Sequence, residues 1–511
     1  MVKDELIEVD GRHYVLATSS RLSDPPRVLK HGDSFAVFDR SGDAQVIGSG
    51  EQGIFFEGTR YLSKMELTIE GSRPVLLNST IKNNNTLLTV DLTNPNLYRH
   101  GERVLPQGSI HVFRAKLLWE GVCYEHLRLI NYTDIDRQIS LGVALDADYA
   151  DIFEVRGKKR DKRGKRLPVQ RTRKELLLGY VGLDKVTRQT RIEFSEEPTS
   201  LDDSGAHFNS FLPAGGEREI ILFVEFFSRK PVPRKASYDV VLRESADTLQ
   251  RARSGDCAVS TSNEQFNNWL NRSQADVHML LTPTEQGPYP YAGIPWFSTP
   301  FGRDGIITAL EYLWVNPDIA RGALNFLAAH QATEENPDQE AEPGKIFHEV
   351  RKGEMAALGE IPFGLYYGTV DATPLFVMLA GEYYDCTGDL ALIRSIWPNI
   401  EAALRWIEVY GDADGDGFIE YQRHNPRGLV HQGWKDSDDS VFHADGRAAQ
   451  GSIALCEVQG YVYSAKCHAA KLARLLAKPE LASALAQQAE TLKEHFNPDF
   501  PLALYCGCTT H

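Results

Sequence analysis

Residues 301–313 read FGRDGIITALEYL, and this stretch predicts the character of the second half of the chain. Its apolar side chains recur every three or four residues, as on one face of a helix: Ile306, Ile307, Leu310 and Leu313. The same spacing recurs in three later segments: 320–327, 375–379 and 396–407. About eight helices are expected up to the C-terminus, most joined by short turns and a few by long loops.

The first half of the chain has a different pattern. Up to about residue 245, the apolar residues fall in short runs rich in β-branched and aromatic types, such as 87–90, 110–113 and 220–224. Turn clusters such as Asn94-Pro95-Asn96 separate the runs. We therefore predict a multidomain chain, with an N-terminal all-β sandwich over 1–250 and an all-α domain over 251–511. Ser262 and Gln265 form the capping box expected to start the first helix of the second domain.

Composition excludes several classes of protein. The chain has 511 residues, of which 42% are hydrophobic and 24% charged, so it is long enough for two globular cores. The net charge of -15 disfavours a nucleic-acid partner. The start lacks the apolar core of a signal peptide and no apolar run is long enough to cross a bilayer, so we expect a cytoplasmic protein with no membrane partner. Seven cysteines, an odd number, are expected to be reduced thiols. No pattern specifies an oligomeric state.

The long loops carry the chemistry. A Pro- and Gly-rich segment, residues 289–300, presents Trp296 and Phe297 just before the adjacent pair Arg303 and Asp304. Aromatic faces stack on the apolar faces of pyranose rings, and an Arg and Asp pair binds vicinal hydroxyls with charge-assisted hydrogen bonds. Sugar binding is the prediction for all four residues. The alternative for the two aromatic residues is a place in the core.

A second loop contains Tyr367 and Asp371 just before the helix expected to start near Pro374. We predict that Asp371 accepts a hydrogen bond from a sugar hydroxyl beside a stacking Tyr367. The alternative is that the Asp371 side chain caps the helix.

A third segment, residues 433–440, places three carboxylates behind Trp434 and Lys435. Cleavage of a glycosidic bond needs a general acid with a raised pKa, which an apolar wall and neighbouring carboxylates both favour. We predict that Asp436 is the acid and name Asp438 as the alternative. Lys435 is expected to orient a hydroxyl. A solvated acidic loop without function is the competing interpretation.

One motif stands apart from the sugar site. Its alternating aspartates, followed by glycine, match the first half of a calcium-binding loop: Asp412, Asp414 and Asp416. Glu420 is a further candidate ligand, whereas Arg423 occupies the position that carries a bidentate glutamate in a complete EF-hand loop. No cofactor is required for the predicted chemistry, and a structural Ca²⁺ ion is a hypothesis. A tight turn without metal is the alternative.

The basic run 156–166 lies between strand-like segments of the first domain. An exposed charged loop is the preferred interpretation, and a polyanion site is the alternative.

In this order, the segments 295–304, 367–374 and 433–437 resemble the bacterial glycogen debranching enzyme, or amylo-alpha-1,6-glucosidase, family. The resemblance extends from the β domain to about residue 495. It implies a glucoamylase-like (α/α)6 toroid barrel and inverting hydrolysis of α-glucosidic bonds, with carboxyl groups ~6.5 to 9.5 Å apart. The implied substrates are glycogen-like α-glucans or oligosaccharides, cleaved at α-1,6 branch linkages.

The same resemblance implies a role for each site residue. Asp436 matches the general acid, and Arg303 and Asp304 match residues that hold the terminal glucose. The rest of the implied pocket consists of Trp296, Tyr367, Asp371, Trp434 and Lys435.

The C-terminus departs from the family pattern. An (α/α)6 barrel needs six helix pairs, more than the helices expected here, so a C-terminally truncated barrel is predicted, with the general base beyond residue 511. Such a barrel exposes apolar faces, from which we expect instability. Cys506 and Cys508 suggest a metal motif, but an altered or truncated chain end is the preferred interpretation. A non-catalytic carbohydrate-binding protein is therefore an alternative, and so is a trehalase- or mannosidase-like hydrolase on the same barrel.

Overall fold

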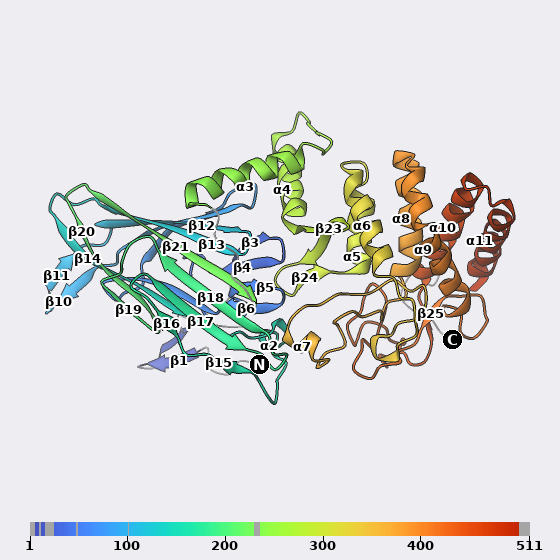
Figure 1. The fold of residues 1–511 in the computed structure, drawn as a ribbon, viewed down its shortest axis with the longest axis horizontal. Helices are drawn as coiled ribbons and strands as arrows, with labels where there is room; N and C mark the ends of the chain where they lie inside the picture. Colours follow the sequence, from blue (N-terminus) through green and yellow to red (C-terminus); the bar gives the residue numbers. More distant parts are fainter. Residues whose placement is uncertain are drawn as a thin grey trace.

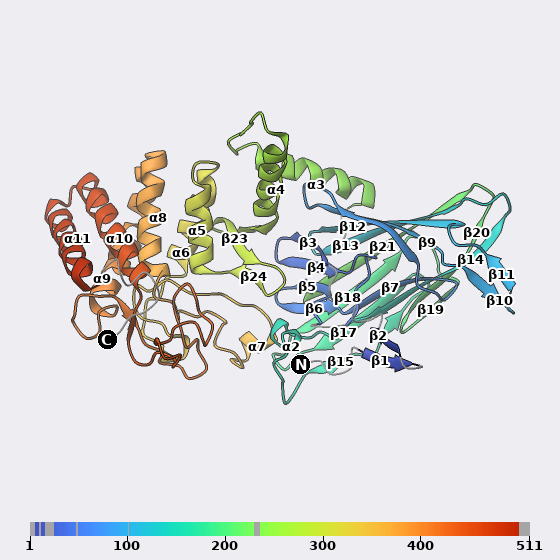
Figure 2. The same cartoon turned by 180° about the vertical axis from the view of Figure 1, so that it is seen from behind.

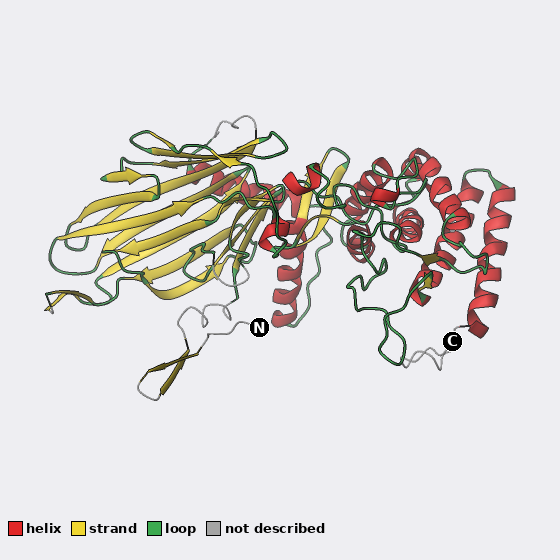
Figure 3. Cartoon of the chain, turned by 90° about the horizontal axis from the view of Figure 1, so that it is seen from below, coloured by secondary structure: helices red, strands yellow, loops and turns green. Residues whose placement is uncertain are grey.

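The computed structural model describes residues 6–9, 12–15, 25–46, 50–100, 102–228 and 236–499. Strands fill one half of the molecule and helices the other (Figures 1 and 3). The helices α10 and α11 lie at the end farthest from the strands (Figure 2). The predicted order, a β-sandwich followed by a helical domain, is confirmed.

The β domain contains one nine-stranded and two four-stranded antiparallel sheets. The large sheet runs β15-β17-β18-β21-β13-β12-β9-β8, with β16 paired to β17. Its strands are β8 (Val75–Ile81), β9 (Leu87–Thr93), β12 (Ile110–Trp119), β13 (Val122–Asn131), β15 (Lys165–Arg166), β16 (Gln170–Arg171), β17 (Glu175–Val181), β18 (Thr187–Phe194) and β21 (Glu217–Ser228). The three predicted runs lie in β9, β12 and β21.

The smaller sheets run β19-β20-β14-β7 and β3-β4-β5-β6. Their strands are β3 (Arg27–His31), β4 (Ser34–Phe38), β5 (Gly53–Phe56), β6 (Thr59–Leu62), β7 (Lys64–Ile69), β14 (Arg137–Asp146), β19 (Ser200–Asp202) and β20 (Gly205–Leu212). Two hairpins complete the domain: β1 (Leu6–Val9) with β2 (Arg12–Val15), and β10 (Leu97–Arg99) with β11 (Glu102–Leu105). Side chains alternate between buried and partly buried along β18 and other strands, and the inward sets of all three sheets form one core.

Two details at the junction differ from the sequence prediction. Helix α3 (Tyr238–Arg253) begins inside the region expected to be β structure, because Tyr238 and Val241 pack with Tyr124 and Phe223 of the large sheet. Helix α4 (Glu264–Leu280) is capped by Asn263, whose side chain accepts a hydrogen bond from the Phe266 backbone, and not by Ser262.

The helical domain consists of paired helices in an open arc. Helices α5 (Gly302–Tyr312), α8 (Ala372–Thr387) and α10 (Cys456–Leu475) pack in succession as one row, and α6 (Pro317–Ala329) packs on α9 (Leu390–Val409) in a second. Helix α11 (Pro479–Asp499) packs on α10, and α7 (Glu354–Ala357) lies near the β domain. From α4 to α11, the described residues contain eight α-helices, in agreement with the prediction.

Short elements join these helices. The aromatic segment predicted as a loop forms part of a small sheet of β22 (Leu281–Thr284), β23 (Gly287–Gly293) and β24 (Phe297–Pro300). The single-turn helix η1 (Pro337–Gln339) and the pair β25 (Glu420–Tyr421) and β26 (Ile453–Ala454) lie within the long loops. Those loops gather at one end of the helices, the lower end in Figure 1.

No helix in the described parts of the chain is long and apolar enough to cross a membrane. The five cysteines that the structure describes are free thiols. Cys506 and Cys508 lie outside the described residues.

The basic run ties the two domains together. Arg160, after α2 (Ile152–Val155), contacts Glu354 of α7 at 3.2 Å and Glu360 at 2.7 Å, and its side chain is only 2% exposed. Glu354 also accepts hydrogen bonds from the Tyr180 hydroxyl and the Leu183 backbone. The prediction of an exposed charged loop is therefore wrong for Arg160, because two of its neutralising carboxylates, Glu354 and Glu360, come from a segment 194 to 200 residues away and join the nearby Glu154.

Replacement of Glu354 by alanine is expected to lower the free energy of unfolding by about 1.5–3 kcal/mol, since it removes the charged acceptor of the hydrogen bonds from Arg160, Tyr180 and Leu183. Burial alone raises the pKa of Glu354, but hydrogen bonds from Leu183, Arg160 and Tyr180 outweigh it and lower the pKa. Because the folded-state pKa is the lower one, this stabilisation is present above the unfolded-state pKa and is lost as pH falls through the folded-state pKa. Urea unfolding at several pH values measures both effects.

The matched control is Glu360→Ala, which removes a more exposed partner of the same arginine. Its loss is expected to be about 1 kcal/mol or less. Equal losses in the two variants contradict the assignment of Glu354 as the central acceptor.

Candidate active site

Arg303 brings three distant loops to one point. Its Nη1 donates to Asp371 Oδ2 at 3.0 Å and to the Gly433 carbonyl at 2.6 Å, and its Nη2 donates to Asp436 Oδ2 at 3.1 Å. The side chain is 8% exposed. The first of the three motifs therefore supplies this guanidinium, and the other two contribute the groups that it contacts.

The backbone before Arg303 explains how it reaches this position. Phe301 is the N-cap of α5, so Arg303 lies in the first helical turn. Gly302 passes so close to the neighbouring loop that a Cβ atom would lie 2.1 Å from the Phe347 carbonyl oxygen. Only glycine fits there, and this close approach sets Arg303 beside the segment that follows Phe347.

Asp371 is the buried counter-charge of Arg303. It is 1% exposed, and its Oδ1 accepts a hydrogen bond from the Thr369 hydroxyl at 2.5 Å. Asp371 occupies the N-cap position of α8, but its side chain makes no capping hydrogen bond. The capping alternative is therefore wrong for the side chain, and both carboxylate oxygens already have protein partners.

Asp436 is a partly exposed member of the cluster. Its side chain is 38% exposed, and His348 Nε2 lies 3.7 Å from the same Oδ2 that Arg303 contacts. Among the hydrogen bonds of the described residues, none involves Oδ1 of Asp436. Asp438 is exposed and lies outside the Arg303 contacts. Geometry therefore separates the preferred acid from its alternative.

Asp304 lies on another side of the guanidinium. Its Oδ2 is 4.0 Å from Arg303 Nε, and its side chain is 42% exposed. Burial raises the pKa of Asp304, Arg303 acts in the opposite direction, and the neighbouring Asp371 and Asp436 raise it further. The result is a raised pKa for a carboxyl group that remains accessible to a ligand.

The predicted aromatic residues divide into two groups. Phe297 and Trp434 are exposed, and Trp296 is partly buried, so their rings are accessible to a sugar. Tyr367 is 4% exposed within the helical core, and its hydroxyl donates to the His330 carbonyl at 2.8 Å. That placement leaves Tyr367 without a free face. Lys435 is exposed, and no described ion pair joins it to Asp436.

Sequence reasoning missed a buried polar segment beside this cluster. His348 is 3% exposed, and burial together with Arg303 and Arg351 lowers its pKa well below the ordinary value. Glu349 is bound to Arg351 at 2.5 Å, and burial raises its pKa. The dense mixture of charges in residues 348–351 was the available signal, but such a mixture is more often found in solvated loops.

The predicted metal ligands lie in a different loop. One carboxylate oxygen from each of Asp412, Asp414 and Asp416 lies within 4.8 Å of the others. Glu420 follows in β25 and is 7% exposed.

Comparison with known proteins fits this architecture. Residues 29–222 match a family described as the N-terminal domain of (some) glycogen debranching enzymes. The β domain is therefore similar to that domain. A search of curated proteins gave no match.

Two solved structures share the fold over nearly the whole chain. The "Putative kojibiose phosphorylase from human microbiome" has a TM-score of 0.60 and 12% sequence identity, over 94% of this chain and 68% of that one. A bacterial glucoamylase complexed with acarbose has a TM-score of 0.56 and 10% identity, over 91% of this chain and 66% of that one. The chain thus spans about two thirds of their length. At such identities the likeness concerns the fold alone, a β-sandwich followed by an (α/α)6-type helical domain.

Replacement of Arg303 by methionine is expected to lower the free energy of unfolding by about 3–5 kcal/mol, because it leaves the Asp371 carboxylate buried without a cation. Urea unfolding measures the change. Arg447→Met is the control, since the Arg447 side chain is 81% exposed, and its effect is expected to stay within about 0.5 kcal/mol. An Arg303→Met protein as stable as the wild type refutes the role of Arg303 as the centre of the cluster.

Proposed function

We propose that the chain is a glycoside hydrolase that cleaves α-glucosidic bonds, with α-1,6 branch linkages of α-glucans or oligosaccharides as substrates. The observation that carries the proposal is the contact of Arg303 with Asp371, Gly433 and Asp436, which joins three motifs into one site. Exposed aromatic rings beside an accessible carboxylate are typical of sugar sites.

Asp436 is the proposed general acid of an inverting reaction. Arg303 holds its Oδ2, and no hydrogen bond of the described residues involves its Oδ1, so Oδ1 is the oxygen proposed to carry the proton to the leaving oxygen. Asp304, with its raised pKa and accessible side chain, is proposed to bind sugar hydroxyls together with Arg303. Phe297, Trp296 and Trp434 supply stacking faces.

An inverting enzyme also needs a carboxylate that activates water on the opposite face of the sugar. Asp371 and Glu349 are bound to guanidinium groups and are buried. We therefore propose that the general base comes from outside the described residues, and that the described site supplies sugar binding and the acid.

Hydrolysis of a limit dextrin tests the proposal. Asp436→Asn is expected to reduce product release by about 10²- to 10⁴-fold, because it removes the general acid. Asp438→Asn, an exposed neighbour in the same loop, is the matched control and is expected to retain activity. Equal loss in both variants, or loss only in Asp438→Asn, overturns the assignment of Asp436.

Two further measurements separate the alternatives. Proton NMR of the first product shows whether the anomeric configuration is inverted, and assays with and without inorganic phosphate separate hydrolysis from phosphorolysis. Binding of the dextrin without any turnover supports a non-catalytic carbohydrate-binding protein instead. Turnover of trehalose or an α-mannoside, but not of the dextrin, supports the other hydrolase specificities.

A further inference from the structure

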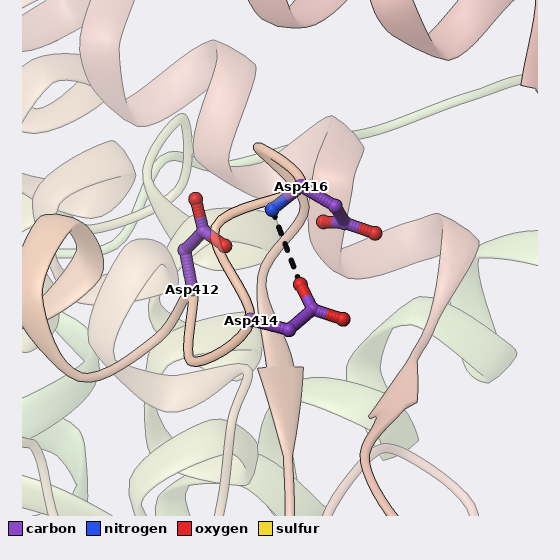
Figure 4. A group of neighbouring side chains, drawn as sticks. All are labelled: Asp412, Asp414 and Asp416. Atoms are coloured by element: carbon purple, nitrogen blue, oxygen red, sulfur yellow. Dashed lines mark hydrogen bonds between the residues drawn. The ribbon is translucent and has the colours of Figure 1, made fainter.

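The loop between α9 and β25 gathers carboxylates at alternate positions. Figure 4 shows the side chains of Asp412, Asp414 and Asp416 around one turn of this loop. Asp412 accepts hydrogen bonds from the Gly415 and Gly417 backbones at 2.8 and 3.1 Å, so the loop curls around its first carboxylate. The three like charges repel one another at this spacing.

Glu420 adds a fourth carboxylate from the buried side. The residue is 7% exposed, and its Oε1 has no hydrogen-bond partner. The Glu420 carboxylate also hydrogen-bonds to the Ser452 side chain and to the backbone of Ala413, which lies between Asp412 and Asp414. Burying an unpartnered carboxylate oxygen next to like charges costs free energy unless a cation neutralises it.

We propose that Asp412, Asp414, Asp416 and Glu420 bind a Ca²⁺ ion. Calcium prefers six to eight oxygen ligands and tolerates irregular geometry, as a loop of alternating carboxylates provides. Arg423 replaces the bidentate glutamate of a complete calcium loop, so the affinity is expected to be weaker than that of an EF-hand sensor.

The proposed ion would stabilise the segment that leads to Asp436. Tyr421, next to Glu420, bonds through its hydroxyl to His431 Nδ1 at 2.9 Å. Gln432 then accepts a hydrogen bond from the Val370 backbone at 2.8 Å. These contacts connect the calcium loop to the Arg303 cluster, without placing the ion in contact with the sugar.

Titration calorimetry of chelator-treated protein with CaCl₂ tests the site. The wild type is expected to bind one Ca²⁺ ion and to unfold at a higher temperature in its presence. Asp414→Asn and Glu420→Gln are expected to weaken binding at least tenfold. Asp439→Asn, an exposed aspartate elsewhere, is the control and should bind as the wild type does.

No heat and no thermal shift with the wild type overturn the proposal. So does a Glu420→Gln protein that is more stable than the wild type in the presence of CaCl₂, since Glu420 is then only an uncompensated buried charge. MgCl₂ is titrated in parallel, and tighter binding of Mg²⁺ than of Ca²⁺ contradicts the assignment of the ion.

A second, independent observation concerns Arg156, at the C-terminal end of α2 in the β domain. Its guanidinium carbon lies 5.4 Å from the ring centre of Phe297 and 5.9 Å from that of Trp296. Among the side-chain interactions of the described residues, Arg156 has ring contacts but no hydrogen bond or ion pair. Its pKa is lowered by burial and by Arg351, while Glu349 and Asp436 act in the opposite direction.

We infer that Arg156 is a substrate-binding residue that the β domain supplies to the site of the helical domain. A guanidinium has five N–H donors at its edges. Because its flat face stacks on the two aromatic rings, these donors stay free for the hydroxyl oxygens of a sugar bound over Phe297. The neighbouring Arg160 holds this segment against α7. This inference rests on the proposed function, because it assigns a ligand contact at the same site.

Calorimetric titration with a branched maltooligosaccharide in the Asp436→Asn background, where turnover is suppressed, tests the inference. Arg156→Gln is expected to raise Kd by about 10- to 100-fold through loss of charge-assisted hydrogen bonds. Lys159→Gln removes a charge of the same sign from the same exposed segment and is expected to leave Kd unchanged.

The outcomes distinguish the two proposals. If the Asp436→Asn protein binds no oligosaccharide, the proposed function fails. If the Asp436→Asn protein binds the oligosaccharide with the same Kd with and without the Arg156→Gln substitution, the proposed function stands and the role of Arg156 is refuted. Equal weakening by Lys159→Gln also refutes it, because net charge then explains the effect.

Discussion

The site depends on one buried cation. Arg303 is nearly enclosed, and a guanidinium in such a place must be neutralised and hydrogen-bonded. Asp371 supplies the buried charge, the Gly433 carbonyl supplies a second acceptor and Asp436 supplies an accessible one. The fork geometry of arginine allows it to hold three acceptors from two distant loops at once, which a lysine ammonium with its single nitrogen does less specifically. The orientation of Asp436 follows from this arrangement.

The β domain also contributes side-chain contacts near the site of the helical domain. Arg160 is buried against Glu354 and Glu360, and this ion-pair cluster holds α7 against α2. Arg156 lies four residues earlier and reaches the aromatic rings beside the site. A shift between the domains therefore changes the surroundings of Phe297. Under the proposed function, sugar binding depends on both domains.

Much of the architecture could be predicted from local patterns. Residues 301–313 form a helix because their apolar side chains share one face, and 220–224 form a buried strand for the corresponding reason in a sheet. Helix α3 was missed because Tyr238 and Val241 are its main buried apolar residues, too few to give a clear period. The cap at Asn263 was missed by one residue, since several polar residues there are able to cap a helix.

The sequence by itself determined the two-domain order, the helical and strand periods, and the three motifs that carry arginine and carboxylates. Local spacing encodes these features, because periodicity and turn chemistry act over a few residues. Only the tertiary structure decided which of those groups meet. It brought Arg303, Asp371 and Asp436 together, buried Tyr367 in the core, and turned part of a basic run into a contact between domains. Contacts between residues that lie 68 to 194 positions apart depend on how the elements pack, and no local pattern specifies that packing.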